Sequence, residues 1–103
     1  MKNKYSTKLT RNMLTGLYDL IEKLLITEAA TEDDKMLFCL LEEIRQSLYN
    51  KMDAVKPMYT VKLTPAQSFA IRILYSDYVM VSTTYMGNKL HSMSNEISQH
   101  YQI

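Results

Sequence analysis

The stretch from Thr64 to Tyr85 constrains the fold most strongly, because it joins a well-specified helix start to a long apolar body. The Thr64 hydroxyl can accept a hydrogen bond from a free amide of the first helical turn. Pro65 suits the next position, where no amide hydrogen is needed, and Gln67 stands where a capping box requires it. The pattern predicts a long helix over residues 65–86.

The apolar residues of this predicted helix fall on two stripes. A helix that is apolar over most of its circumference is usually buried rather than lying on a surface. The other helices of so short a chain can cover one stripe but leave the second thinly covered. We therefore take the second stripe as a candidate interface with a partner; it consists of Ile71, Tyr75, Tyr78 and Tyr85.

Helical periodicity predicts three further helices, over about residues 8–27, 32–54 and 88–101. Gly16 inside the first of them is unfavourable by about 1 kcal/mol relative to alanine. The close approach of a neighbouring helix would explain a glycine at that position.

Residues 58–63 break the helical pattern, because Tyr59, Val61 and Leu63 alternate with polar side chains as in an extended segment. No other strand is predicted, so we expect a crossover laid against the helices. The alternative is a strand that pairs with its copy in a second chain. No internal repeat is evident. The predicted fold is all-α: a single domain over residues 1–103, a three- to four-helix bundle with a long central helix and a short extended crossover before it.

The composition agrees with a small helical domain. Two glycines and two prolines are few for 103 residues, and the net charge of +1 gives no general attraction to nucleic acid or membranes. Cys39 is the only cysteine, which excludes an intrachain disulfide, and its apolar neighbours predict a buried, unreactive thiol. No apolar run has the length of a membrane-spanning helix or the form of a signal peptide, so we expect a cytoplasmic protein without membrane association.

No set of side chains predicts catalysis. His91 and His100 do not share a helix face as a metal-binding pair would, and we expect Glu96 and His100 to make only a surface contact. The chain has no phosphate-binding glycine loop and no pattern of a nucleophile beside a base. We expect a protein that is not an enzyme and that binds no metal or cofactor.

The C-terminal part carries three segments in a recognisable order: LTPAQSFAIRILY at Leu63–Tyr75, MGNKL at Met86–Leu90, and Ile97–Ser98. This order resembles the helix-turn-helix core of winged-helix regulators of the multiple-antibiotic-resistance type, with the turn at His91. The resemblance implies DNA binding by residues 82–101. The side chains that would face bases or phosphates are Ser94, Asn95 and Gln99.

The leading functional hypothesis is a small non-enzymatic protein that acts through protein–protein contacts and self-associates as a homodimer through its central helix. Docking on a different protein, as a small adaptor, would leave the same pattern in the sequence. The alternative hypothesis is the DNA-binding helix-turn-helix protein that the resemblance implies.

Overall fold

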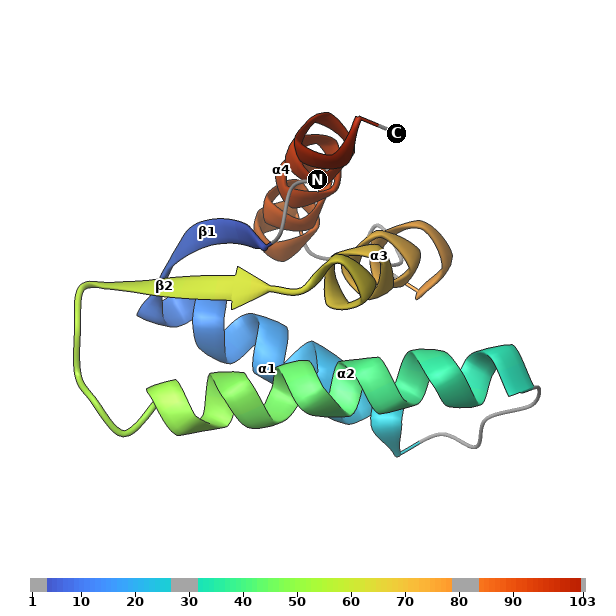
Figure 1. Ribbon diagram of the computed structural model, residues 1–103. Coiled ribbons are helices and arrows are strands. Elements are labelled where there is room, and N and C mark those ends of the chain that lie inside the picture. Colours follow the sequence, from blue (N-terminus) through green and yellow to red (C-terminus); the bar gives the residue numbers. More distant parts are fainter. Residues whose placement is uncertain (1–3, 27–31, 79–83, 103) are drawn as a thin grey trace.

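The structure departs from an all-α bundle because two strands far apart in the sequence pair with each other. The computed structural model describes residues 4–26, 32–78 and 84–102. The elements in order are β1 (Tyr5–Thr10), α1 (Arg11–Leu25), α2 (Glu32–Lys51), β2 (Met58–Leu63), α3 (Pro65–Ile73), η1 (Leu74–Tyr78) and α4 (Thr84–Tyr101). β1 and β2 form a two-stranded antiparallel sheet beside the helices (Figure 1), which we call the ribbon. The all-α prediction is therefore wrong, and the fold is a helix-rich mixed α/β fold.

β1 is a strand because its side chains alternate between the core and the solvent. The sequence predicts a helix from about residue 8, whereas the strand continues to Thr10. The register pairs Tyr5 with Leu63 and Leu9 with Tyr59, which places the apolar side chains of both strands on one face. The segment predicted as a lone crossover thus has its strand partner within the same chain. The inward side chains are Tyr5, Thr7, Leu9, Tyr59, Val61 and Leu63.

The predicted central helix is divided. Its start is confirmed, because α3 begins with the capping box between Thr64 and Gln67. A π-helical turn, η1, follows α3, and α4 begins at Thr84 and runs through Gly87. Residues 79–83, which the prediction includes, lie outside the described residues. A long central helix is therefore not the organising element of the fold.

Two predictions about single residues have different outcomes. A Cβ atom on Gly16 would stand 3.3 Å from the sulfur of Met86 on α4, so a neighbouring helix does approach closely there. Cys39 is exposed on α2 rather than buried, because the inward face of that helix is formed by residues such as Leu37 and Leu41. Among the described residues, no helix has both the length and the apolar character needed to cross a membrane.

The expectation that the chain has no internal repeat is wrong, because the chain contains two similar halves, β1–α1–α2 and β2–α3–α4, with η1 extending α3. The segment YSTKLT at 5–10 matches YTVKLT at 59–64, and in each half the last threonine caps the helix that follows. The second helices also bury side chains at the same spacing. These are Leu41, Ile44 and Leu48 in α2, and Leu90, Met93 and Ile97 in α4.

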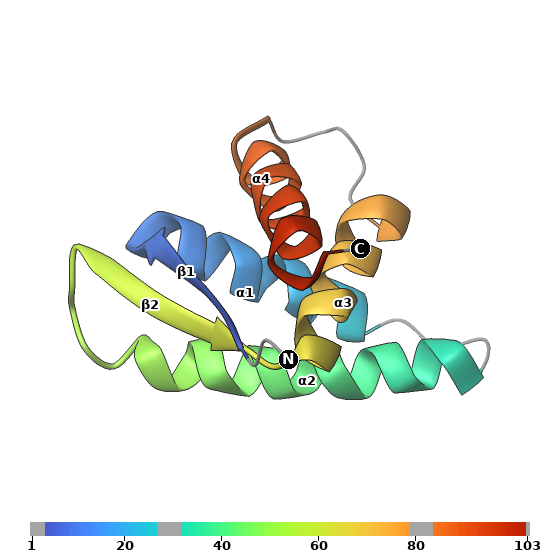
Figure 2. The ribbon, with the colours of Figure 1, turned by 45° about the horizontal axis from the view of Figure 1, so that its top comes forward.

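The two halves interlock around one core. α1 packs against α2 and α3 against α4, while α2 also contacts α3 and α1 also contacts α4. β1 of the first half contacts α4 of the second, and β2 of the second contacts α2 of the first. Figures 1 and 2 show the ribbon at the end of the molecule that holds the loop from α2 to β2, away from the first turn of α2.

Candidate functional site

The ribbon presents one face to solvent, and this face is polar and basic. Lys8 stands directly across from Thr60, and Lys62 stands across from Ser6, so each lysine faces a hydroxyl. No acidic residue belongs to this face of the two strands. We call these six side chains the ribbon face: Ser6, Lys8, Thr10, Met58, Thr60 and Lys62.

Two tyrosines anchor the buried side of the ribbon at its opposite ends. Tyr5 donates a hydrogen bond to Glu96 of α4, and Tyr59 donates one to the carbonyl of Ala54. Burial, together with the bond to Glu96, raises the pKa of the Tyr5 phenol well above its usual range. Both tyrosines are buried, so they fix the inward face of the ribbon against the rest of the molecule.

Each strand leads into a capped helix, which fixes where the chain leaves the ribbon. The hydroxyl oxygen of Thr10 accepts a hydrogen bond from the Met13 amide at 3.3 Å. In the second half, the Thr64 hydroxyl accepts from the Gln67 amide at 3.2 Å, and Gln67 Oε1 accepts from the Thr64 amide at 3.0 Å. Caps of this kind contribute about 0.5–2 kcal/mol each, so both ends of the ribbon are held in place.

The two lysines of the ribbon face are available to a ligand. Neither Lys8 nor Lys62 forms an ion pair within the part of the chain that the structure describes. Arg11 lies close by but is already engaged, because its guanidinium donates to the carbonyls of Met52 and Ala54. Arg11 therefore holds the loop before β2, and the lysines carry the free charge of this face.

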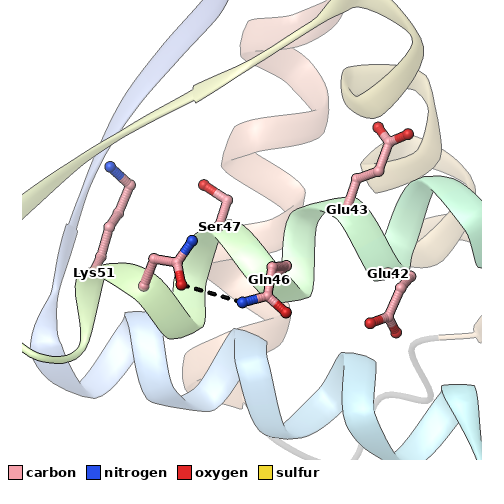
Figure 3. A pocket seen from close by; sticks show the side chains of 6 residues that line it. Glu42, Glu43, Gln46, Ser47 and Lys51 are labelled. Atoms are coloured by element: carbon pink, nitrogen blue, oxygen red, sulfur yellow. Dashed lines mark hydrogen bonds between the residues drawn. The ribbon is translucent and has the colours of Figure 1, made fainter.

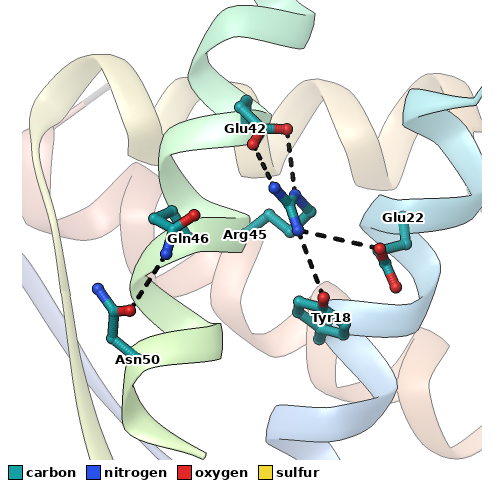
Figure 4. Close-up of polar contacts among 6 residues, drawn as sticks. All are labelled: Tyr18, Glu22, Glu42, Arg45, Gln46 and Asn50. Atoms are coloured by element: carbon teal, nitrogen blue, oxygen red, sulfur yellow. Dashed lines mark hydrogen bonds and ion pairs between the residues drawn. The ribbon is translucent and has the colours of Figure 1, made fainter.

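A second polar cluster joins α1 to α2 (Figure 4). Arg45 forms an ion pair with Glu42 through two nitrogens, and its Nη1 lies 3.9 Å from Glu22 Oε2 and 3.3 Å from the Tyr18 hydroxyl. The hydrogen bonds from Arg45 lower the pKa of the Glu42 carboxyl. Because the arginine is neutralised within the cluster, these residues tie two helices together and offer little charge to a ligand.

A shallow groove on α2 is a weaker candidate. Its lining side chains all come from a single helix, and Gln46 and Asn50 hydrogen-bond to each other at 3.1 Å (Figure 3). A binding pocket requires polar groups that converge from several elements, which this groove lacks. The described residues also contain no group of three metal-ligating side chains. The groove is lined by Glu42, Glu43, Gln46, Ser47, Asn50 and Lys51.

Of the predicted interface stripe, the structure describes the side chains of Ile71 and Tyr75. Ile71 is fully buried within the chain, so its side chain does not reach the surface. Tyr75 is half-buried, and its hydroxyl lies 2.8 Å from Nδ1 of His91. The side chains of Tyr78 and Tyr85 lie outside the described part of the structure.

The exposed apolar residues of α3 instead come from the other stripe of the predicted helix, which includes Phe69 and Ile73. Ala70 and Leu74 of the same stripe are buried. Phe69 is 39% exposed and Ile73 is 41% exposed. The Phe69 ring lies 5.8 Å from the Tyr101 ring of α4, measured between centroids. The corresponding positions of α1 in the first half hold Thr15 and Asp19. An apolar surface at this place is thus a property of the second half and not of the fold.

The three predicted DNA contacts all lie on α4, where Ser94 is half-buried and Asn95 and Gln99 are exposed. Asn95 Nδ2 lies 3.3 Å from Nε2 of His91. The helix-turn-helix resemblance places its turn at His91, but α4 is a continuous helix through that residue. The structure therefore keeps these side chains on one helix without a turn before them.

The ribbon face was not predicted from the sequence. Residues 58–63 were expected to be unpaired, and the first helix was expected to begin at about residue 8, inside β1. The available signal was the match between YSTKLT and YTVKLT, with lysine at the same place in both. Each copy also has the period-two alternation of a strand.

The chain matches no protein-family model, no curated protein and no solved structure in the three comparisons with known proteins.

Proposed function

We propose that this chain binds double-stranded DNA by placing the ribbon face in the major groove. The major groove of B-DNA is about 12 Å wide and admits a two-stranded β-ribbon as well as a helix. One observation carries the proposal: lysine and hydroxyl side chains from two paired strands share a solvent-facing surface that contains no acidic residue.

The side chains of the ribbon face suit the edges of bases and the phosphates beside them. Lys8 and Lys62 can donate to phosphate oxygens or to the acceptors of guanine. Ser6 and Thr60 can both donate and accept, so they can serve several bases. The Lys8 and Lys62 ammonium groups need not break an existing ion pair among the described residues before they bind DNA.

Duplex RNA is a poor alternative ligand for this face. The major groove of A-form RNA is deep and narrow, and side chains do not reach its floor. A two-stranded ribbon that presents its polar side chains on one face requires a wide groove. Binding should therefore favour duplex DNA over duplex RNA of the same sequence.

Lysines on a short sheet also have a purely protective role, because charge on an edge strand discourages pairing with other sheets. The test must separate this role from DNA binding. It compares the Lys8→Ala, Lys62→Ala double variant with a Lys23→Ala, Lys35→Ala double variant of equal net charge. Lys23 and Lys35 are exposed at the end of α1 and the start of α2, and Figure 1 shows both places away from the ribbon.

The measurement is fluorescence anisotropy with a labelled duplex of mixed sequence, over a series of salt concentrations from about 50 to 200 mM. We expect salt-dependent binding by the native chain, and a fall of about two in the salt slope for the ribbon variant. The control variant should keep the native slope. Equal losses in both variants, or no binding at low salt, would contradict the proposal.

The second candidate function is self-association through α3, favoured by the exposure of Phe69 and Ile73. The matching positions of α1 show that the fold accepts polar residues there. Light scattering at micromolar concentration should give a mass above 12.0 kDa for the native chain. Replacing Phe69 by Thr and Ile73 by Asp, the residues at the matching positions of α1, should return the mass to that of one chain. A native chain that is already monomeric would remove this candidate.

A further inference from the structure

The ribbon has an approximate two-fold axis within a single chain. Lys8 corresponds to Lys62 in the matched segments, and Ser6 corresponds to Thr60. In the sheet, Ser6 pairs with Lys62 and Lys8 pairs with Thr60. A rotation that carries each strand onto the matching strand therefore turns the first pair into the second. The axis passes through the central pair, in which Thr7 faces its own counterpart Val61.

This axis relates the two lysines of the ribbon face. They are diagonal neighbours on the same side of the sheet, since the direct partner of Lys8 is Thr60, two residues before Lys62. Diagonal neighbours of this kind stand about 7–8 Å apart. That separation corresponds to roughly two base-pair steps of about 3.4 Å along DNA.

Duplex DNA has local two-fold axes of the same kind, because its strands are antiparallel. A protein with two-fold symmetry binds DNA sites whose halves are inverted copies of each other. Lysine reads guanine most readily, through the acceptors O6 and N7. Two lysines related by the axis therefore select guanines on opposite strands.

We propose, on the basis of the proposed DNA-binding function, that this chain reads a short inverted repeat within one major groove. Lys8 contacts a guanine on one strand, and Lys62 contacts a guanine on the other strand about two base pairs away. Ser6 and Thr60 contact the bases beside them. One chain supplies both halves of the reading surface, so each half can be changed separately by substitution.

The test is selection of bound sequences from a pool of randomised DNA duplexes by the native chain, Lys8→Ala and Lys62→Ala. The native chain should enrich an inverted repeat with guanines on opposite strands. Each single variant should retain one guanine and lose the other, with its preference at the lost position reduced roughly five- to 150-fold. Lys8→Arg should retain both guanines, because arginine reads the same acceptors.

The outcomes separate this inference from the proposed function. Enrichment of sequences without inverted symmetry, or identical selected sequences for all variants, would overturn the inference. So would salt-dependent binding by the native chain with no enrichment at all, although general DNA binding would then stand. Absence of any binding to duplex DNA would overturn both. Circular dichroism on each variant checks the fold, which substitutions at exposed positions should leave intact.

Discussion

The two halves of the molecule share a framework but differ in how α1 and α3 use it. Leu14 of α1 and Ser68 of α3 occupy matching positions, and both are fully buried. Asp19 is exposed on α1, whereas the matching Ile73 is an exposed apolar residue on α3. At these positions α3 has a polar atom inside and an apolar side chain outside. The fold accepts a buried leucine and an exposed aspartate at these positions of α1, so the different residues of α3 mark where α3 gives up stability or serves another purpose.

The polar links between the helices differ as well. Arg45 of α2 contacts Tyr18 and Glu22 of α1 while it also pairs with Glu42 of its own helix (Figure 4). η1, which extends α3, is joined to α4 by the contact between the Tyr75 hydroxyl and His91, and His91 also contacts Asn95 of its own helix. The two pairs of helices are thus joined by different side chains, although the buried residues of α2 and α4 keep the same spacing.

The largest effect should come from truncating the leucine that stands at the same position in each strand. Leu9→Ala and Leu63→Ala each remove a buried side chain from the inward face of the ribbon, and each should lower the free energy of unfolding by about 2–5 kcal/mol. Urea denaturation of both variants measures the losses. A cost below about 1 kcal/mol for only one of them would show that the halves do not contribute equally to the ribbon.

Alanine at the matching helix positions should have effects of opposite sign. Leu14→Ala leaves a cavity and should cost about 2–5 kcal/mol. Ser68→Ala removes a buried hydroxyl that has no hydrogen-bond partner among the described residues, and should raise the free energy of unfolding by about 1–3 kcal/mol. Thermal unfolding of both variants tests the comparison. A destabilised Ser68→Ala variant would mean that the hydroxyl has a partner, such as a water molecule.

A smaller effect is expected at the helix caps. Thr10→Ala and Thr64→Ala each leave an amide of the first helical turn without its acceptor, and each should cost about 0.5–2 kcal/mol. Replacement by serine should preserve most of the stability, because serine supplies the same hydroxyl. Guanidinium denaturation distinguishes the two substitutions. If alanine lowered the free energy of unfolding no more than serine did at one cap, the hydroxyl of that cap would not contribute to stability.

The smallest effect at neutral pH is expected at Tyr5 of β1, and it becomes measurable only at alkaline pH. Because its pKa is raised in the folded state, Tyr5 keeps its proton to higher pH when folded than when unfolded. Its stabilising contribution is complete below the unfolded pKa of about 10 and is lost as the pH rises through the folded pKa. Tyr5→Phe should therefore flatten the fall in stability above about pH 10. Unfolding curves recorded at pH values on both sides of that point measure the slope, and an unchanged slope would exclude Tyr5 as its source.

The sequence was sufficient for the features that depend on local patterns. The cap at Thr64 and the helical periodicity of α2 lie within short windows, so the start of α3 and the position of α2 followed directly. The helix predicted to end near residue 54 ends at Lys51, a few residues before Pro57, because proline restricts the residue before it. These features need no knowledge of distant neighbours.

The ribbon depends on a contact between distant residues, which local patterns do not reveal. β1 is short and follows a basic end segment. Its alternation of apolar and polar residues is a weaker signal than the helical periodicity of the residues that follow, so the first helix was predicted to begin too early. The prediction that residues 58–63 had no partner strand then hid the candidate site, because the lysines of a lone crossover have no defined neighbours. Comparing YSTKLT with YTVKLT would have joined both strands and pointed to Lys8 and Lys62.

The pairing of Tyr5 with Leu63 also sets an order of events during synthesis. β1 leaves the ribosome first and has no strand partner until the chain has been extended through α1 and α2 to β2. A single strand is not stable in water, so the ribbon can close only after that point, and long-range pairing of this kind is slow compared with helix formation. A nascent chain that has not reached Leu63 therefore cannot form the ribbon face, and the two lysines share a surface only once both strands have been made.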